Sequence, residues 1–256
     1  MCTLTAERRS DRRLITMNRD EARTRGEELP PALIPSPADS SVDFPQRLAP
    51  IDGPSGGTWF GVNDRGVVAG LLNLYDAEDA APAPRGTTSR GILVPEVLAF
   101  ATIEEAVTQA TTLVAADEST PRFSPFRLAI FAPDGDRLVV WNRSGELSVE
   151  DLPRDAVFLS SSSWRASAVL PWREERYHAW RASGAPHRGS LPTFHIDQPE
   201  GRAEWAPLMA REKSSTRSLS QVEIPHGGKN AELRYWARPS TASEEPDVAV
   251  ALPLLV

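Results

Sequence analysis

Residues 1–21 read MCTLTAERRSDRRLITMNRDE, and this stretch decides how the N-terminal part of the chain folds. Two short segments suited to β-strands, 2–4 and 13–17, flank the polar turn 7–11. This pattern predicts an antiparallel hairpin. The two open ends of a hairpin lie side by side, so we expect Cys2 to neighbour the tetrapeptide Asn18-Arg19-Asp20-Glu21.

Cys2 is the only cysteine, and it directly follows Met1. Methionine aminopeptidases remove Met1 when the next side chain is small, which would leave a thiol and a free α-amine on one residue. A thiol has a pKa of about 8.5 and an α-amine one of about 7.7–8.0, so the amine can accept the thiol's proton near neutral pH. Cys2 is therefore a candidate nucleophile that carries its own base. The alternative is an isolated cysteine packed as a small hydrophobic residue.

The composition excludes several classes of protein. The 256 residues show no internal boundary, so we expect a single domain over 1–256. A net charge of −7 argues against nucleic acid and anionic membrane as partners. No apolar run reaches the ~18 residues that a membrane span needs, and no secretory signal is visible. With a lone cysteine this favours a cytoplasmic protein. Four scattered histidines predict no metal site.

Further along the chain, pairs of strands alternate with helices. Turns at 63–66, 133–136 and 226–229 predict three more hairpins. Helices are expected at 172–182, at 202–213, and after the capping box Thr102-Ile-Glu-Glu105. The seven prolines of residues 29–54 predict a long surface loop. Runs of antiparallel strands separated by helices indicate the α+β class.

Several short motifs follow one another in a recognisable order. They are Cys2, NRDE at 18–21, GGTWFG at 56–61, Asn73, SRG at 89–91, Pro171-Trp172 and STRS at 215–218. The pattern resembles the NRDE family, also called the transport and Golgi organisation protein 2 family, from residue 2 to about residue 240. That family is similar to N-terminal-nucleophile hydrolases of the penicillin V acylase and bile salt hydrolase type. The resemblance implies a four-layer αββα sandwich of two antiparallel sheets between helices.

The resemblance also implies roles for individual residues. Cys2 would be the nucleophile and, through its amine, the base. Asp20 would accept a hydrogen bond from the α-ammonium, and Arg19 would lower the pKa of the thiol. Asn73 would sit where the backbone N–H of the oxyanion hole lies, and Arg217 would be a second cation near the nucleophile. For Arg19 and Asp20 the alternative is an ordinary surface ion pair.

Asn18, Trp59 and Ser161 are further candidates for the substrate pocket, with core packing as the alternative for Trp59. Residues 159–164 read LSSSSW, where family members usually have Leu-Ser-Asn. In the hydrolases an asparagine here supplies an oxyanion donor, and loss of one such donor costs ~10²–10³ in rate. The hydroxyl of Ser161 is the candidate replacement.

The resemblance thus implies a hydrolase that cleaves a linear, non-peptide amide of a small molecule through an acyl-thioester on Cys2, without a cofactor. One alternative is a non-catalytic binding or trafficking protein on the same scaffold, which would handle haem or an acyl-CoA or lipid ligand. Another is an amidotransferase-type glutaminase, which would need a synthase partner. The sequence indicates no oligomeric state.

Overall fold

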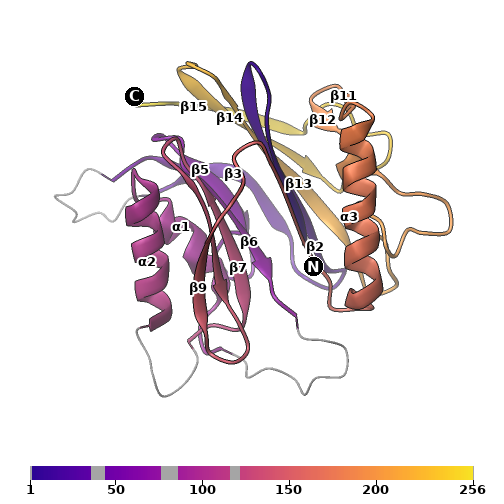
Figure 1. Cartoon of the computed structure of the whole chain (residues 1–256), viewed down its shortest axis with the longest axis horizontal. Coiled ribbons are helices and arrows are strands. Elements are labelled where there is room, and N and C mark those ends of the chain that lie inside the picture. Colours follow the sequence, from indigo (N-terminus) through magenta and orange to yellow (C-terminus); the bar gives the residue numbers. More distant parts are fainter. Residues whose placement is uncertain (1, 36–43, 76–85, 116–121, 256) are drawn as a thin grey trace.

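The computed structural model describes residues 2–35, 44–75, 86–115 and 122–255. Two antiparallel β-sheets lie between helices (Figure 1). Helices α1 (Leu93–Val97) and α2 (Ile103–Ala115) cover the outer face of one sheet, and α3 (Ala166–Ala182) covers that of the other. The predicted α+β class and the αββα layering are confirmed.

The first sheet contains the N-terminal hairpin. Its strand order is β10-β1-β2-β13-β14-β15. The strands are β1 (Cys2–Arg8), β2 (Arg12–Ala22), β10 (Ala156–Ser161), β13 (Ser214–Pro225), β14 (Asn230–Ala237) and β15 (Val248–Pro253). β1 and β2 pair as predicted, and the register sets Cys2 opposite both Arg19 of β2 and Ser161 of β10.

The second sheet is built by the middle of the chain, in the order β3-β4-β5-β6-β7-β8-β9. Its strands are β3 (Glu28–Ile34), β4 (Arg47–Asp52), β5 (Phe60–Asn63), β6 (Val68–Asn73), β7 (Phe126–Phe131), β8 (Asp136–Trp141) and β9 (Leu147–Asp151). Four short elements complete the chain: η1 (Arg90–Ile92), β11 (His187–Arg188), β12 (Leu191–Pro192) and η2 (Thr193–Ile196).

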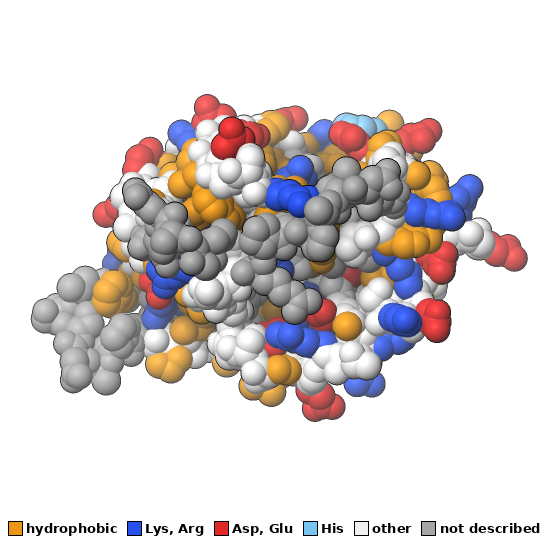
Figure 2. Space-filling model, turned by 90° about the horizontal axis from the view of Figure 1, so that it is seen from below, with side chains coloured by type: hydrophobic (Ala, Val, Ile, Leu, Met, Phe, Trp, Pro, Cys, Tyr) orange, Lys and Arg blue, Asp and Glu red, His pale blue; other side chains and the backbone are white. Residues whose placement is uncertain are grey.

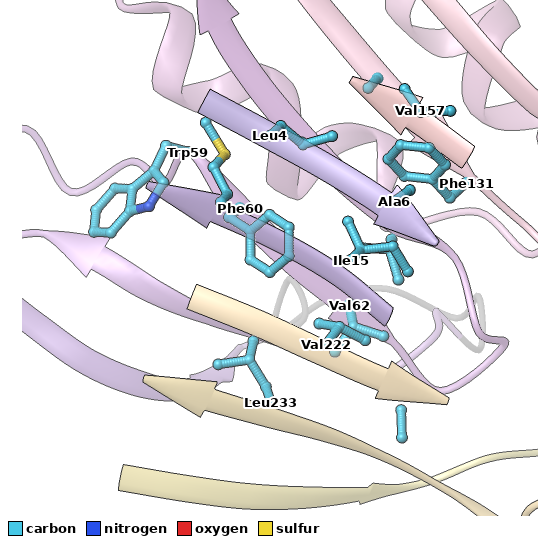
Figure 3. Packing of buried hydrophobic residues seen from close by; sticks show 14 of the residues in the cluster. Leu4, Ala6, Ile15, Trp59, Phe60, Val62, Phe131, Val157, Val222 and Leu233 are labelled. Carbon is cyan, nitrogen blue, oxygen red and sulfur yellow. The ribbon is translucent and has the colours of Figure 1, made fainter. Parts of the chain in front are cut away.

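The main core lies between the two sheets. Leu4 and Ile15 of the first sheet pack there with Phe60 and Phe131 of the second, all of them completely buried (Figure 3). Successive strand residues point to opposite faces. The side chains of Cys2, Leu4 and Ala6 therefore enter this core. Those of Thr3 and Thr5 face the layer that contains α3.

The prediction of a long loop at 29–54 is wrong at both of its ends, where β3 and β4 form; residues 36–43 lie outside the described residues. β3 tolerates Pro30 and Pro31 because it is the edge strand of its sheet. Its pairing with β4 shifts register between Leu29 and Ala32, where the two prolines lie. Proline is accepted at edges and irregularities because it has no N–H to donate to a neighbouring strand.

The predicted helix at 202–213 is also wrong, since this segment consists of turns. Its backbone groups have partners elsewhere in the fold. The carbonyl groups of Trp205 and Ala206 accept hydrogen bonds from Arg173, and the N–H of Met209 donates to Thr216 Oγ1. By contrast, the capping box at the start of α2 is confirmed, because Thr102 Oγ1 accepts from the Glu105 N–H.

Within the described ranges, no helix has the length and apolar character that a membrane crossing requires. On the face shown in Figure 2, acidic and basic side chains are interspersed, so neither sign of charge dominates it.

Candidate active site

Cys2 begins β1 and lines a cavity of about 350 Å³. The motif residues Arg19, Asp20, Trp59 and Asn73 line the same cavity. Glu21, Arg25, Asp52 and Arg90 add further charged groups to its wall. The structure therefore brings most of the predicted site residues together, from β2 of the first sheet and from β6 and the segment before β5 of the second. Met1, whose removal the sequence predicts, lies outside the described residues.

The environment of Cys2 disfavours a spontaneous thiolate. Burial raises the pKa of the thiol, and the charge of Asp20 adds to this effect. A hydrogen bond from the Asp20 backbone and the positive charge of Arg19 oppose it. On the other side of the residue, the Cys2 backbone N–H donates to Ser161 Oγ at 3.0 Å. A reaction at this sulfur therefore needs a base close to the thiol.

Arg19 is fixed from three sides. Its guanidinium forms ion pairs with Glu28 and, at 2.8 Å, with Asp52. It also lies over the ring of Trp59, 4.4 Å from the ring centroid. Trp59 is thus both a buried core residue and a wall of the cavity. Because Glu28 and Asp52 also interact with the charge of Arg19, this charge only partly offsets the rise in the pKa of Cys2 that burial causes.

Asp20 is buried and is held from the α3 side of the sheet. Its Oδ1 accepts a hydrogen bond of 2.7 Å from Thr216 Oγ1, and its Oδ2 lies 3.8 Å from Arg173 Nη2. Burial raises the pKa of the Asp20 carboxyl, and the charge of Arg173 opposes that shift. The alternative of a surface ion pair between Arg19 and Asp20 does not describe the structure, since both residues are buried and each has other partners.

Arg173 of α3 is a buried cation that the sequence did not single out. It is completely buried. Its guanidinium donates to the carbonyl groups of Trp205 and Ala206 at 2.7 and 2.8 Å. It also donates to Thr3 Oγ1 at 3.0 Å and to Ser160 Oγ at 3.2 Å. One side chain thereby joins α3, two strands of the first sheet and the 205–206 turn behind the Cys2 site.

Asn18, a predicted pocket residue, lies outside the cavity, on the face that turns towards η2. Its Nδ2 donates to the carbonyl groups of His195 and Pro207, both at 2.9 Å. Its Oδ1 must then accept from His195 Nδ1, so Nε2 of the neutral ring accepts from Thr5 Oγ1 at 2.7 Å. Asn18 therefore anchors the segment that carries η2 to the sheet.

Because His195 is buried, we predict that the free energy of unfolding depends on pH. Burial lowers its pKa to about 3, whereas an unfolded histidine has a pKa of about 6.5. Between these values only the unfolded state takes up the proton, so stability falls as the pH decreases. From pH 7 to pH 5 this contribution amounts to about 2 kcal/mol. Urea unfolding of the wild type and His195→Gln at both pH values should show a smaller loss in the variant. An equal loss in both would contradict this assignment.

Ser161 and Arg217 also lie away from the cavity wall. The Ser161 hydroxyl is engaged with the Cys2 backbone: it accepts from the Cys2 N–H and donates to the Cys2 carbonyl oxygen. Arg217 lies at a register irregularity of β13, and its Nη1 donates to the carbonyl groups of residues 22, 23 and 25. It lines a separate groove of about 650 Å³.

The GGTWFG and SRG motifs meet through their glycines. The N–H of Thr58 donates to the Gly91 carbonyl at 3.0 Å. A Cβ atom on Gly57 would lie only 2.8 Å from the Gly91 carbonyl carbon, so this backbone contact requires glycine. The contact sets Trp59 and Arg90 on the same cavity wall, although the two motifs are about thirty residues apart in sequence.

The described part of the chain contains no group of three or more His, Cys, Asp or Glu side chains that could hold a metal ion. The cavity wall itself presents the thiol of Cys2, three guanidinium groups, the carboxylates of Asp20, Glu21 and Asp52, and the amide of Asn73.

A family model described as Transport and Golgi organisation 2 matches residues 1–204. Among solved structures, penicillin V acylase from Agrobacterium tumefaciens is 14% identical, with a TM-score of 0.53 over 99% of this chain and 86% of that chain. The C2A mutant of conjugated bile acid hydrolase from Clostridium perfringens is also 14% identical, with a TM-score of 0.51 over 99% of this chain and 92% of that chain. These structures share the fold. A search of curated proteins gives no match.

Proposed function

The chain belongs to the Transport and Golgi organisation 2 family, and from its Cys2 site we propose that it is an N-terminal-nucleophile hydrolase that cleaves a linear amide of a small molecule. One observation carries the proposal. The Cys2 side chain faces a cavity of charged and polar groups, while its nitrogen is held by Ser161 Oγ within the same sheet. The sharing of a fold with two amide-cleaving enzymes agrees with this reading.

In the proposed reaction the mature chain begins at Cys2. Its α-amine accepts the thiol proton, and the thiolate attacks the amide carbonyl carbon. The tetrahedral intermediate collapses, the C–N bond breaks, and the leaving amine takes the proton back from the Cys2 ammonium. Water, deprotonated by the same amine, then attacks the acyl-thioester and releases a carboxylic acid and the thiol. Each step balances without a cofactor.

The neighbouring residues support these steps electrostatically. The charge of Arg19 favours the thiolate, which burial alone would disfavour. Asp20, oriented by Thr216, stabilises the α-ammonium when it forms. Asn73 lines the cavity and is our candidate oxyanion donor, with its side-chain amide placed by a hydrogen bond of 3.0 Å to Tyr75. Arg217 stabilises the segment after β2 rather than the reaction centre.

A non-catalytic binding protein is the second candidate, and the serine run favours it. The Ser161 O–H donates to the Cys2 carbonyl oxygen, and Ser161 does not line the cavity, so it is poorly placed to replace the asparagine that the hydrolases use. A binding protein for haem, an acyl-CoA or a lipid could retain the same cavity without turnover. The numerous charged groups of that wall suit a polar small molecule better than an extended apolar one.

Intact-mass spectrometry after mixing the protein with a panel of activated acyl amides tests the proposal. We expect a chain that lacks Met1 and a transient adduct with the mass of the acyl group, located on Cys2 by peptide mapping. A mature protein that retains Met1, or one that never acquires an adduct on Cys2, would contradict the hydrolase and leave the binding role.

A further inference from the structure

Three guanidinium groups line the Cys2 cavity, and they differ in how their charge is balanced. Arg19 and Arg25 each lie 2.8 Å from a carboxylate oxygen of Asp52. Arg90 forms no ion pair with any carboxylate among the residues that the structure describes. The two other arginines that line the cavity are both engaged in such pairs, so Arg90 is the exception on this wall.

Arg90 uses little of its capacity to donate hydrogen bonds. A guanidinium carries five N–H donors. The structure records one bond from this group, from Nη1 to the carbonyl of Pro125 at 2.8 Å. Burial lowers the pKa of Arg90, and the charges of Tyr75, Cys2 and Glu21 partly offset that effect. The guanidinium is thus half-buried, electrostatically coupled to the nucleophile, and part of a residue that lines the cavity.

The position of Arg90 is fixed by the backbone around it. Ser89 caps the short helix η1 by accepting from the Gly91 N–H at 3.3 Å. Gly91 is in turn held against Gly57 and Thr58 by the backbone contact described above. A half-buried cation on a fixed backbone, with one of its nitrogens already bound to a carbonyl, loses less side-chain entropy on binding an anion than a mobile surface arginine does.

We propose that Arg90 binds a carboxylate of the substrate, so that the amides which reach Cys2 are anionic molecules. A planar guanidinium and a carboxylate match each other in charge and in geometry. This inference names the substrate class and rests on the proposed function, but its test does not require turnover.

Alkylation of the single cysteine provides that test. In iodoacetate and iodoacetamide the Cys2 thiolate displaces iodide from the same carbon, forming a thioether, and the reagents differ only in a carboxylate against a neutral amide. We expect the ratio of the two rates, iodoacetate over iodoacetamide, to be higher in the folded protein than in the urea-unfolded chain. Arg90→Gln should lower the ratio by about tenfold, the effect of one charge-assisted hydrogen bond. Arg90→Lys should retain part of the preference.

The rate ratio separates binding of the carboxylate from changes in the thiol itself. Loss of a nearby cation raises the pKa of Cys2 and slows both reagents equally, so the ratio is unaffected by that change. Arg25→Gln is the matched control, because it removes a cavity arginine whose charge Asp52 already balances. A ratio that is the same in Arg90→Gln and wild type would overturn the inference. The hydrolase proposal fails separately, through the absence of an acyl adduct.

Discussion

Cys2→Ala is expected to lower the rate of amide hydrolysis by about 10⁴–10⁶-fold, the loss seen when an enzyme loses its covalent nucleophile. Alanine retains the α-amine but cannot form an acyl-thioester. Cys2 is small and lies at the start of its strand, so the fold should survive the change. Hydrolysis of the best amide from the panel, measured with matched protein concentrations, provides the readout. Equal rates for wild type and variant would exclude Cys2 as nucleophile.

Ser161→Ala is the informative companion to that variant. It removes the hydroxyl that holds the Cys2 nitrogen and leaves the thiol in place. If the nitrogen is the base, its loss of orientation should reduce turnover by about 10–100-fold, with a smaller effect on substrate binding. An unchanged rate would show that the nitrogen of Cys2 has no part in proton transfer.

The N-terminal half of the site could be predicted because it is local. Strand periodicity and one polar turn define the β1–β2 hairpin, and a hairpin must place its open ends together. Cys2 and Arg19 are accordingly paired in the sheet. The same reasoning could not assign faces. It grouped Asn18 with the pocket, whereas the alternation along β2 turns that side chain towards His195.

The prediction that further residues line the cavity rested on the family resemblance. No periodicity or turn pattern in the sequence indicated them. Asn73 ends β6 of the second sheet and Trp59 lies directly before β5, and strand periodicity does not indicate which sheet faces which. The contact between Gly57 and Gly91 is likewise long-range. A pair of glycines indicates that another backbone segment comes close, but it does not indicate which segment. The position of Arg90 on the cavity wall therefore could not be predicted from the sequence.

The burial of Arg173 was not predicted from the sequence. The residues Val169, Arg173, Tyr177 and Trp180 share the spacing of one helix face, and all are buried. The spacing therefore contained a signal, but an arginine is ordinarily assigned to the surface. The hydrogen-bond partners of Arg173 could not be predicted either. Two of them are the backbone carbonyl groups of Trp205 and Ala206, in a segment whose composition predicts a helix.

Arg173→Met is expected to reduce the free energy of unfolding by about 3–5 kcal/mol, the cost of removing one partner from a buried charge pair. Methionine occupies a similar length but donates no hydrogen bond. The carbonyl groups of Trp205 and Ala206 would lose their partner inside the protein, and the carboxyl of Asp20 would lose the cation that lowers its pKa. Urea unfolding at pH 7 measures the change.

Arg176→Met is the control, because this arginine lies on the exposed side of the same helix and pairs with Asp197 at its surface. Its loss should cost no more than about 1 kcal/mol. If Arg173→Met is too unstable to purify, the double variant Arg173→Met with Asp20→Asn should be more stable than the single one, since it no longer buries a carboxylate that has lost the charge of Arg173. Similar stability of Arg173→Met and Arg176→Met would mean that Arg173 only fills space. The expected difference would instead show that the charge and hydrogen bonds of Arg173, and not its volume alone, stabilise the buried layer next to the Cys2 site.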